Sequence, residues 1–231
     1  FKIKAGSMDS RRPAGTDASQ EIGAAGDRAG DGTGDPPNSE NRPDPVSLSD
    51  KTNADNTDNA DIRAVISQMS LEQKAAQLLV AGIEGTEPGE DAVQAIQGYQ
   101  VGGVILFGRN VESAEQLAAL TNGLKELNGD YTPLFLCVDQ EGGRVDRMPP
   151  EVTDLPSALD FGSIADPEAR MDACFTLGQT LAAQCAAFGF NMDFAPSLDI
   201  WSNPDNTVIG DRAFGNDWEW TAFFGMSAVE G

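Results

Sequence analysis

The stretch Pro133-Leu-Phe-Leu-Cys-Val-Asp-Gln-Glu-Gly-Gly-Arg-Val-Asp-Arg147 indicates the fold more clearly than any other part of the chain. Its opening residues, up to Val138, form a short apolar run of the kind found in buried parallel strands. The polar part begins without a break at Asp139, which places a carboxylate at the carboxyl end of the predicted strand. A strand that ends in a charged loop is typical of α/β folds whose sites lie at the strand ends.

The chain on both sides of this stretch repeats an alternation of helix and strand. Other apolar runs, at residues 78–80, 101–107 and 190–196, are predicted as strands. The predicted helices cover residues 62–69, a short segment capped by Ser70 and Gln73, a segment with Val93 and Ile96, and residues 113–127, 167–188 and 218–229. Strands separated by helices in this way predict parallel βαβ units.

Two architectures fit this alternation: an open doubly wound sheet and the beginning of an eight-stranded barrel. No GxGxxG fingerprint follows the first predicted strand, and no GxxxxGK[ST] loop occurs in the chain. Polar residues instead cluster directly after successive strands, where barrels keep their sites. The sequence therefore predicts an α/β fold made of the first four βα units of a TIM-type (β/α)8 barrel, preceded by a disordered tail.

Residues 1–60 are predicted to be that disordered tail or linker, because they hold almost no large apolar side chains. Residues 61–231 form the predicted barrel domain, which is incomplete. The chain has no long apolar run and no signal-peptide pattern, so we expect no transmembrane segment in it. A long polar spacer suits a tethered protein, which slightly favours an extracellular or cell-surface location over a cytoplasmic one.

The net charge of the chain is −22, most of it in residues 61–231. Such a surface repels phosphate groups and anionic lipids, so neither nucleic acid nor a membrane surface is an expected partner. A neutral or cationic ligand fits better, although the charge can also serve solubility alone. Cys137, Cys174 and Cys185 form no CxxC pair, which predicts buried thiols rather than a disulfide framework or a zinc site.

The loop after residue 138 offers a first candidate site. Asp139 can accept hydrogen bonds from two adjacent hydroxyl groups, with a guanidinium such as that of Arg147 nearby, and this is a common way to hold a sugar ring. Gly142 and Gly143 would let the backbone approach a ligand closely. The alternative is structural: Asp139 caps the next turn, and Arg147 pairs with Asp146 or Glu141.

The long loop after the fourth predicted strand offers a second candidate, Arg212, which follows Asp211. In the alternative, Arg212 only neutralises Asp199 or Asp211, and these two aspartates fix the loop by backbone hydrogen bonds. Asp193 lies in an apolar stretch, so a backbone amide or an arginine is its expected partner. The aromatic residues Trp201, Trp218, Trp220 and Phe223 fit a core better than a sugar-stacking surface.

These segments together resemble the family 3 glycoside hydrolases, in particular their β-N-acetylglucosaminidase branch. The matching blocks are Leu78 to Ala81, Gly102 to Phe107, Asp139-Gln-Glu-Gly-Gly-Arg-Val with Arg147, Asp193 to Asp199 and Val208 to Gly215. The resemblance implies a barrel of the TIM type in which Asp139, Arg147 and Arg212 contact a terminal N-acetylglucosamine. It implies no metal and no organic cofactor.

The resemblance also implies a retaining reaction, with an aspartate nucleophile and a histidine as general acid/base. In the family these groups follow later strands; the chain contains no histidine, so both catalytic groups are expected beyond residue 231. We therefore expect the chain alone to hydrolyse nothing. Three functions remain open: a β-N-acetylhexosaminidase acting on cell-wall-type glycans in its full-length form, a β-glucosidase-like relative, and a non-catalytic sugar-binding module.

Overall fold

The computed structural model describes residues 56–231, with side-chain surroundings from Ile62 onward. The predicted tail, residues 1–60, lies outside the described residues except for its last five, which begin helix α1 (Asn56–Gln68). The boundary between tail and domain stays a prediction.

A parallel sheet forms the centre of the described domain. Its strands are β1 (Val80–Gly82), β2 (Gly103–Ile105), β3 (Phe135–Val138) and β4 (Met192–Asp193). They pair in parallel in the order β1-β2-β3-β4, so each strand lies next to the one before it in sequence. A doubly wound sheet would instead extend from its first strand in both directions. The order therefore confirms the barrel interpretation.

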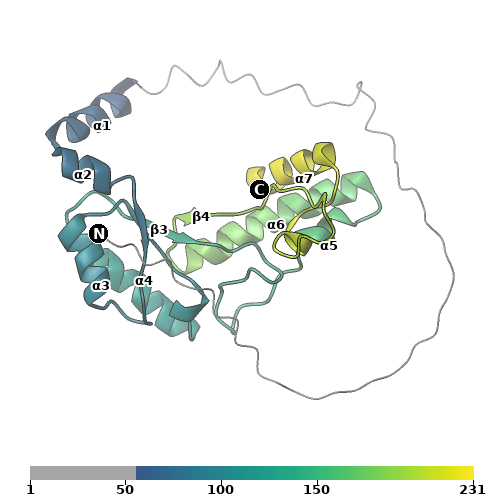
Figure 1. Cartoon of the computed structure of the whole chain (residues 1–231), viewed down its shortest axis with the longest axis horizontal. Helices are drawn as coiled ribbons and strands as arrows, with labels where there is room; N and C mark the ends of the chain where they lie inside the picture. Colours follow the sequence, from purple (N-terminus) through teal and green to yellow (C-terminus); the bar gives the residue numbers. More distant parts are fainter. Residues whose placement is uncertain (1–55) are drawn as a thin grey trace. The chain divides into compact units, whose positions relative to one another are not determined.

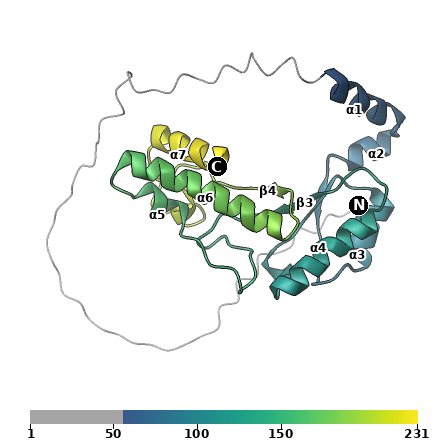
Figure 2. The ribbon, with the colours of Figure 1, turned by 180° about the vertical axis from the view of Figure 1, so that it is seen from behind.

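The helices follow the predicted alternation (Figures 1 and 2). They are α2 (Leu71–Ala76), α3 (Glu90–Val93) with the π-helix η3 (Gln94–Tyr99), the short 3-10 helix η4 (Gly108–Asn110), α4 (Ala114–Asn128), α5 (Ala158–Gly162), α6 (Pro167–Ala187), the 3-10 helix η5 (Gly210–Arg212) and α7 (Trp218–Glu230). The capping box of Ser70 and Gln73 is present as predicted. Asp166 caps α6, and Pro167 occupies its first turn, where a missing N–H costs nothing.

Two apolar clusters hold these layers together. The first packs strand residues such as Val104 and Leu136 against Ile96 of η3 and Leu117 and Leu120 of α4. The second lies between α5, α6 and α7, which Figures 1 and 2 show with α6 and α7 side by side; its largest buried residues are Phe214 and Phe224. Trp220 stacks on Phe224 with ring centroids 5.4 Å apart, so this tryptophan belongs to the core, as predicted.

The three cysteines are buried and free, which confirms their predicted role as small apolar residues. Burial raises the pKa of the Cys137 and Cys174 thiols to about 11, so both stay protonated near neutral pH. Within the described residues, no helix is long and apolar enough to cross a membrane.

The first strand begins later than its apolar pattern predicts. Leu78 and Leu79 are 86% and 57% exposed, and β1 starts at Val80. Within residues 56–231, β1 and β4 each have a neighbour on one side only, which leaves two free sheet edges. Phe194 and Leu198, just after β4, are also largely exposed. Exposed apolar side chains therefore lie just before β1 and just after β4, the two edge strands of this sheet.

Candidate functional site

Asp139 lies at the carboxyl end of the sheet, directly after β3. The pairing of Val138 with Asp193 places the ends of β3 and β4 next to each other. The Asp139 side chain is partly buried and has no hydrogen bond or ion pair with any other described residue. The alternative that Asp139 caps the next turn is therefore wrong, and its carboxylate is free to accept hydrogen bonds from a ligand.

Gln140 fixes the direction in which this loop leaves the strand. It is fully buried, and its side chain accepts a hydrogen bond from the Arg147 backbone N–H (2.7 Å) and donates one to Gln184 of α6 (3.0 Å). Its own backbone N–H donates to Asp193 (2.9 Å). The sequence does not reveal the role of Gln140, because a glutamine between two carboxylates in a polar loop gives no sign of pointing inward.

Asp193 has the backbone-amide partner that the sequence predicts. One carboxyl oxygen accepts from Gln140 N–H, and the other lies 3.5 Å from the Cys185 Sγ. Burial is the main cause that raises the pKa of Asp193 to about 6, and the negative charges of Asp139 and Glu141 add to it. The carboxyl end of the sheet is thus already rich in negative charge before any ligand binds.

The two glycines of the loop serve packing within the protein. Gly142 and Gly143 have φ of 81° and 56°. A Cβ on Gly142 would lie 2.9 Å from the Pro156 carbonyl oxygen, and one on Gly143 would lie 2.8 Å from the Ser157 Cβ. The prediction that these glycines admit a ligand is therefore corrected: the close approach is to the chain's own residues 155–157.

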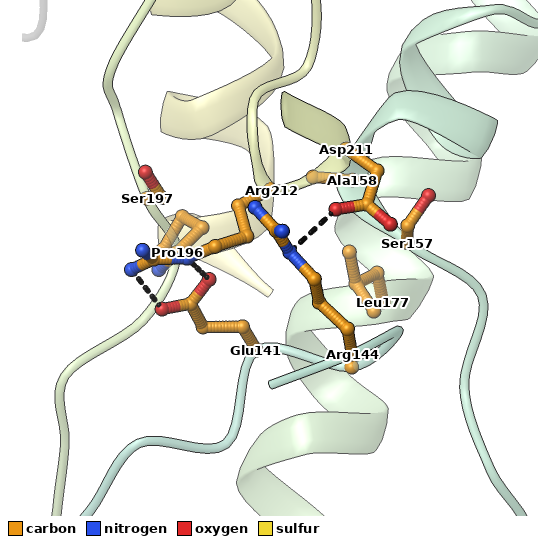
Figure 3. A pocket seen from close by; sticks show the side chains of 10 residues that line it. Glu141, Arg144, Ser157, Ala158, Leu177, Pro196, Ser197, Asp211 and Arg212 are labelled. Carbon is orange, nitrogen blue, oxygen red and sulfur yellow. Dashed lines mark hydrogen bonds and ion pairs between the residues drawn. The ribbon is translucent and has the colours of Figure 1, made fainter. Parts of the chain in front are cut away.

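Arg212 is held by Glu141 (Figure 3). The guanidinium Nε and Nη2 donate to the two carboxylate oxygens at 2.8 and 2.7 Å, and the Glu141 side chain is only 8% exposed. Hydrogen bonding to Glu141 is the main cause that raises the pKa of Arg212, helped by the charges of Glu141 and Asp139. The alternative in which Arg212 pairs with Asp199 or Asp211 is wrong, because its carboxylate partner is Glu141.

A second ion pair joins the same two loops with the charges exchanged: here the arginine follows β3 and the carboxylate follows β4. Arg144 of the loop after β3 pairs with Asp211 at 2.8 Å, as Figure 3 shows, and donates to the backbone carbonyls of residues 207–209 at 2.6–2.7 Å. The pairs Glu141–Arg212 and Arg144–Asp211 therefore join the loops after β3 and β4 at two points. Separations of about 70 residues along the chain make these pairs invisible to any local motif.

The charge of Asp139 helps to raise the pKa of Arg212, so these two predicted contacts share one electrostatic environment, whereas Arg147 has no ion pair with Glu141. Arg147 donates to the Asp146 backbone carbonyl (3.1 Å) and makes no ion pair with the Asp146 or Glu141 carboxylate, so the structural alternative for Arg147 is wrong. Its Nε is buried and has no hydrogen-bond partner among the described residues. An unpaired buried guanidinium N–H next to a candidate site is a donor that a ligand can satisfy.

The hollow between the two ion pairs is too small for a sugar. It is lined by Glu141, Arg144, Asp211 and Arg212 with neighbouring residues, and it encloses about 10 Å³, room for at most one water molecule. Asp139 and Arg147 lie outside it. Within residues 62–231, no group of three or more His, Cys, Asp and Glu side chains is arranged to hold a metal ion.

The described residues thus form an α/β barrel segment with the unpaired Asp139 carboxylate and the Glu141-held Arg212 at the carboxyl end of its sheet. Residues 70–231 match the model of the glycosyl hydrolase family 3 N-terminal domain. The chain therefore belongs to glycosyl hydrolase family 3.

Individual relatives agree with the family. A β-hexosaminidase of Xylella fastidiosa is 36% identical over 156 residues, 67% of this chain and 45% of that protein. A solved family 3 β-N-acetylglucosaminidase from Paenibacillus sp. is 40% identical with a TM-score of 0.63, covering 70% of this chain and 30% of its own. NagZ from Neisseria gonorrhoeae, solved with N-trifluoroacetyl-D-glucosamine, is 34% identical with a TM-score of 0.60, covering 66% and 46%. The chain thus spans less than half the length of these relatives.

Proposed function

We propose that this chain supplies the sugar-holding half of the active site of a retaining β-N-acetylhexosaminidase, which removes terminal N-acetylglucosamine from cell-wall-type glycans. Asp139, Arg147 and Arg212 are the proposed substrate contacts. The observation that carries the proposal is the unpaired Asp139 carboxylate at the end of β3, beside an Arg212 that Glu141 holds in place. The names of the similar β-hexosaminidases support the substrate class.

The chemistry of the three residues suits a neutral sugar. The Asp139 carboxylate accepts hydrogen bonds from two neighbouring hydroxyls, and charge-assisted bonds of this kind are shorter and stronger than neutral ones. The arginines donate only, so they pair with ring, hydroxyl or acetamido oxygens. Arg212 donates to Glu141 through Nε and Nη2 and to the Val208 carbonyl through Nη1 (3.3 Å). The second N–H of Nη1 and that of Nη2 are therefore the donors proposed to meet the ligand.

The reacting groups of a retaining mechanism are a nucleophilic carboxylate and an acid/base. The chain has no histidine, so a histidine acid/base is proposed to come from sequence outside these 231 residues. The chain by itself is then a binder without turnover, and a chromogenic N-acetylglucosaminide should stay uncleaved in its presence.

Calorimetric titration of the chain with N-acetylglucosamine tests the proposal. Asp139→Asn keeps the shape and removes the charge, and it should weaken binding about tenfold or more, the loss of a charge-assisted bond of about 1.5–3 kcal/mol. Arg147→Ala should weaken it to a similar extent. The matched control is Asp172→Asn, an exposed carboxylate on α6, which should bind as the parent does.

Equal affinity of the Asp139→Asn and Asp172→Asn variants would contradict the assignment. Glucose is the comparison sugar: binding of glucose as tight as that of N-acetylglucosamine would favour the β-glucosidase-like alternative. Turnover of the chromogenic substrate by the chain alone would show that the reacting groups lie within it.

A further inference from the structure

A second, larger cavity lies at the opposite end of the sheet. It encloses about 240 Å³, several times the volume of one water molecule, and its lining includes Gln73, Gln77, Gln100, Tyr131 and Thr132. Three of these residues stand in equivalent places: Gln77, Gln100 and Thr132 each come three residues before β1, β2 and β3. The cavity is therefore at the amino ends of the strands, away from Asp139.

Gln100 adopts a backbone conformation that costs free energy. Its φ and ψ are 56° and 50°, and no other non-glycine residue among those described has a positive φ. It also ends η3, a π-helix, and such segments often occur at functional sites. Strain of this kind persists only where neighbouring groups impose it.

Two glutamines impose that conformation. Gln77 donates to the Gln100 backbone carbonyl (2.8 Å), and Gln73 donates to the Gln100 side-chain oxygen (2.9 Å). The Gln73 side-chain oxygen is in turn occupied by the Ser70 backbone N–H. Within the described residues, this network leaves the Gln100 amide nitrogen, the Gln77 amide oxygen and the Gln68 carboxamide without partners, all at the cavity wall.

We propose that this cavity is a second, non-catalytic binding site for a neutral saccharide unit. Carboxamides offer both donors and acceptors, which match hydroxyl groups that also do both. No charged side chain lines the cavity, so nothing in it balances a phosphate, a carboxylate or an ammonium group. The Tyr131 ring, 45% exposed, and Met69 supply an apolar wall for the C–H face of a sugar ring.

The same features argue against other occupants and against chemistry. The cavity has no carboxylate, thiol or histidine, so it holds no group for acid/base or nucleophilic catalysis. Its volume lies just below the usual range of small-molecule pockets, about 300–1,000 Å³. One sugar unit fits that space better than an extended peptide, which would need a groove.

Amide-resolved NMR titration of the whole chain with N-acetylglucosamine tests the proposal, because this neutral sugar reports on both ends of the sheet at once. We expect a set of shifted amides near residues 68–77, 100 and 131–132, separate from any set near residues 139–147. Tyr131→Ala should lower the affinity measured from the amides near residues 68–77, 100 and 131–132 about three- to tenfold, which is the contribution of one aromatic contact. The matched control is Tyr99→Ala, because Tyr99 is 54% exposed and does not line the cavity.

The proposals for the two sites can be refuted independently of each other. Asp139→Asn should remove only the shifts near residues 139–147, which bear on the proposed function. The second site is refuted if residues 68–77, 100 and 131–132 stay unshifted by the sugar, if Tyr131→Ala and Tyr99→Ala behave alike, or if inorganic phosphate shifts the same amides as strongly as the sugar does.

Discussion

The polar groups at the two ends of the sheet are held by different interactions: ion pairs at the carboxyl end and hydrogen bonds between carboxamides at the amino end. At the carboxyl end, Glu141 and Arg144 are held in ion pairs across two loops, and the Asp139 carboxylate has no partner among the described residues. At the amino end, Gln73, Gln77 and Gln100 form a neutral amide network around an open cavity. Charges near a buried strand end need partners to offset desolvation, whereas carboxamides can be left half satisfied at a solvent-lined wall. The carboxyl end is therefore expected to be the more sensitive to single substitutions.

The largest effect should come from breaking the Glu141–Arg212 pair. Glu141→Gln removes the charge and turns an amide NH₂ toward a guanidinium that only donates, so we expect a loss of about 3 kcal/mol in the free energy of unfolding. Urea denaturation measures it. The matched substitution is Glu84→Gln: Glu84 also pairs with an arginine, Arg109 at 3.2 Å, but is 80% exposed.

The exposed pair should contribute at most about 1 kcal/mol, because water screens it. Equal losses for Glu141→Gln and Glu84→Gln would mean that the loops after β3 and β4 are not held together by the buried pair. The contrast between the ion-paired carboxyl end and the neutral amino end of the sheet would then lose its main support.

A second test concerns the rigidity of the loop that carries Asp139. Gly142→Ala places a side chain at φ 81° and 2.9 Å from the Pro156 carbonyl oxygen, and we expect a loss of about 2 kcal/mol in the free energy of unfolding. Gly85→Ala is the control, because its φ of 79° is similar but its Cβ would meet nothing closer than 3.9 Å. That variant should lose only about 1 kcal/mol. If the two losses match, the loop yields instead of clashing.

A third, smaller effect is the pH dependence that Asp193 confers on the carboxyl end. Its pKa is raised from 3.8 to about 6, so between these pH values the folded protein binds more protons than the unfolded chain. The stabilisation that Asp193 contributes is fully present below pH 3.8, the pKa in the unfolded chain, and is lost as the pH rises through about 6, the pKa in the folded protein. The shift sets an upper limit of about 3 kcal/mol, and solvent screening at this partly buried site lowers the expected change to about 1 kcal/mol.

Asp193→Asn should remove that dependence. The Asn oxygen can still accept from Gln140 N–H, and the repulsion with Asp139 and Glu141 disappears. The variant should match the parent near pH 4 and exceed its stability near pH 7 by about 1 kcal/mol, measured by urea denaturation at both pH values. A variant that is less stable than the parent at pH 7 would show that the Asp193 charge is needed.

The sequence predicts the carboxyl end of the sheet far better than the amino end. The apolar run that ends at Val138 predicts a strand, and the polar loop that starts at Asp139 predicts a site. Both can be predicted because the strand and the charged residues follow each other directly in the sequence. The partner of Arg212 could not be predicted, because Glu141 lies 71 residues away and other carboxylates stand closer in sequence. The apolar pattern predicts too early a start for the first strand, because Leu78 and Leu79 look like core residues although both are exposed and precede β1. The amide cavity has no motif, since its glutamines come from three elements: the end of α1, α2 with its C-cap, and the C-cap of η3.

The smallest effect on the free energy of unfolding should come from the amino end, where Gln100→Gly makes three contributions that largely cancel. Glycine relieves the positive φ by about 1–2 kcal/mol, but it adds about 0.4–1 kcal/mol of unfolded-state entropy and loses the bond from Gln73, worth about 0.5–1.5 kcal/mol. The free energy of unfolding should therefore change by less than about 0.5 kcal/mol in urea denaturation. If strain at Gln100 exists to shape the cavity, the variant should keep its stability and lose sugar-induced NMR shifts near residues 131–132. Gain of stability with unchanged shifts would mean that the strained residue serves neither fold nor ligand.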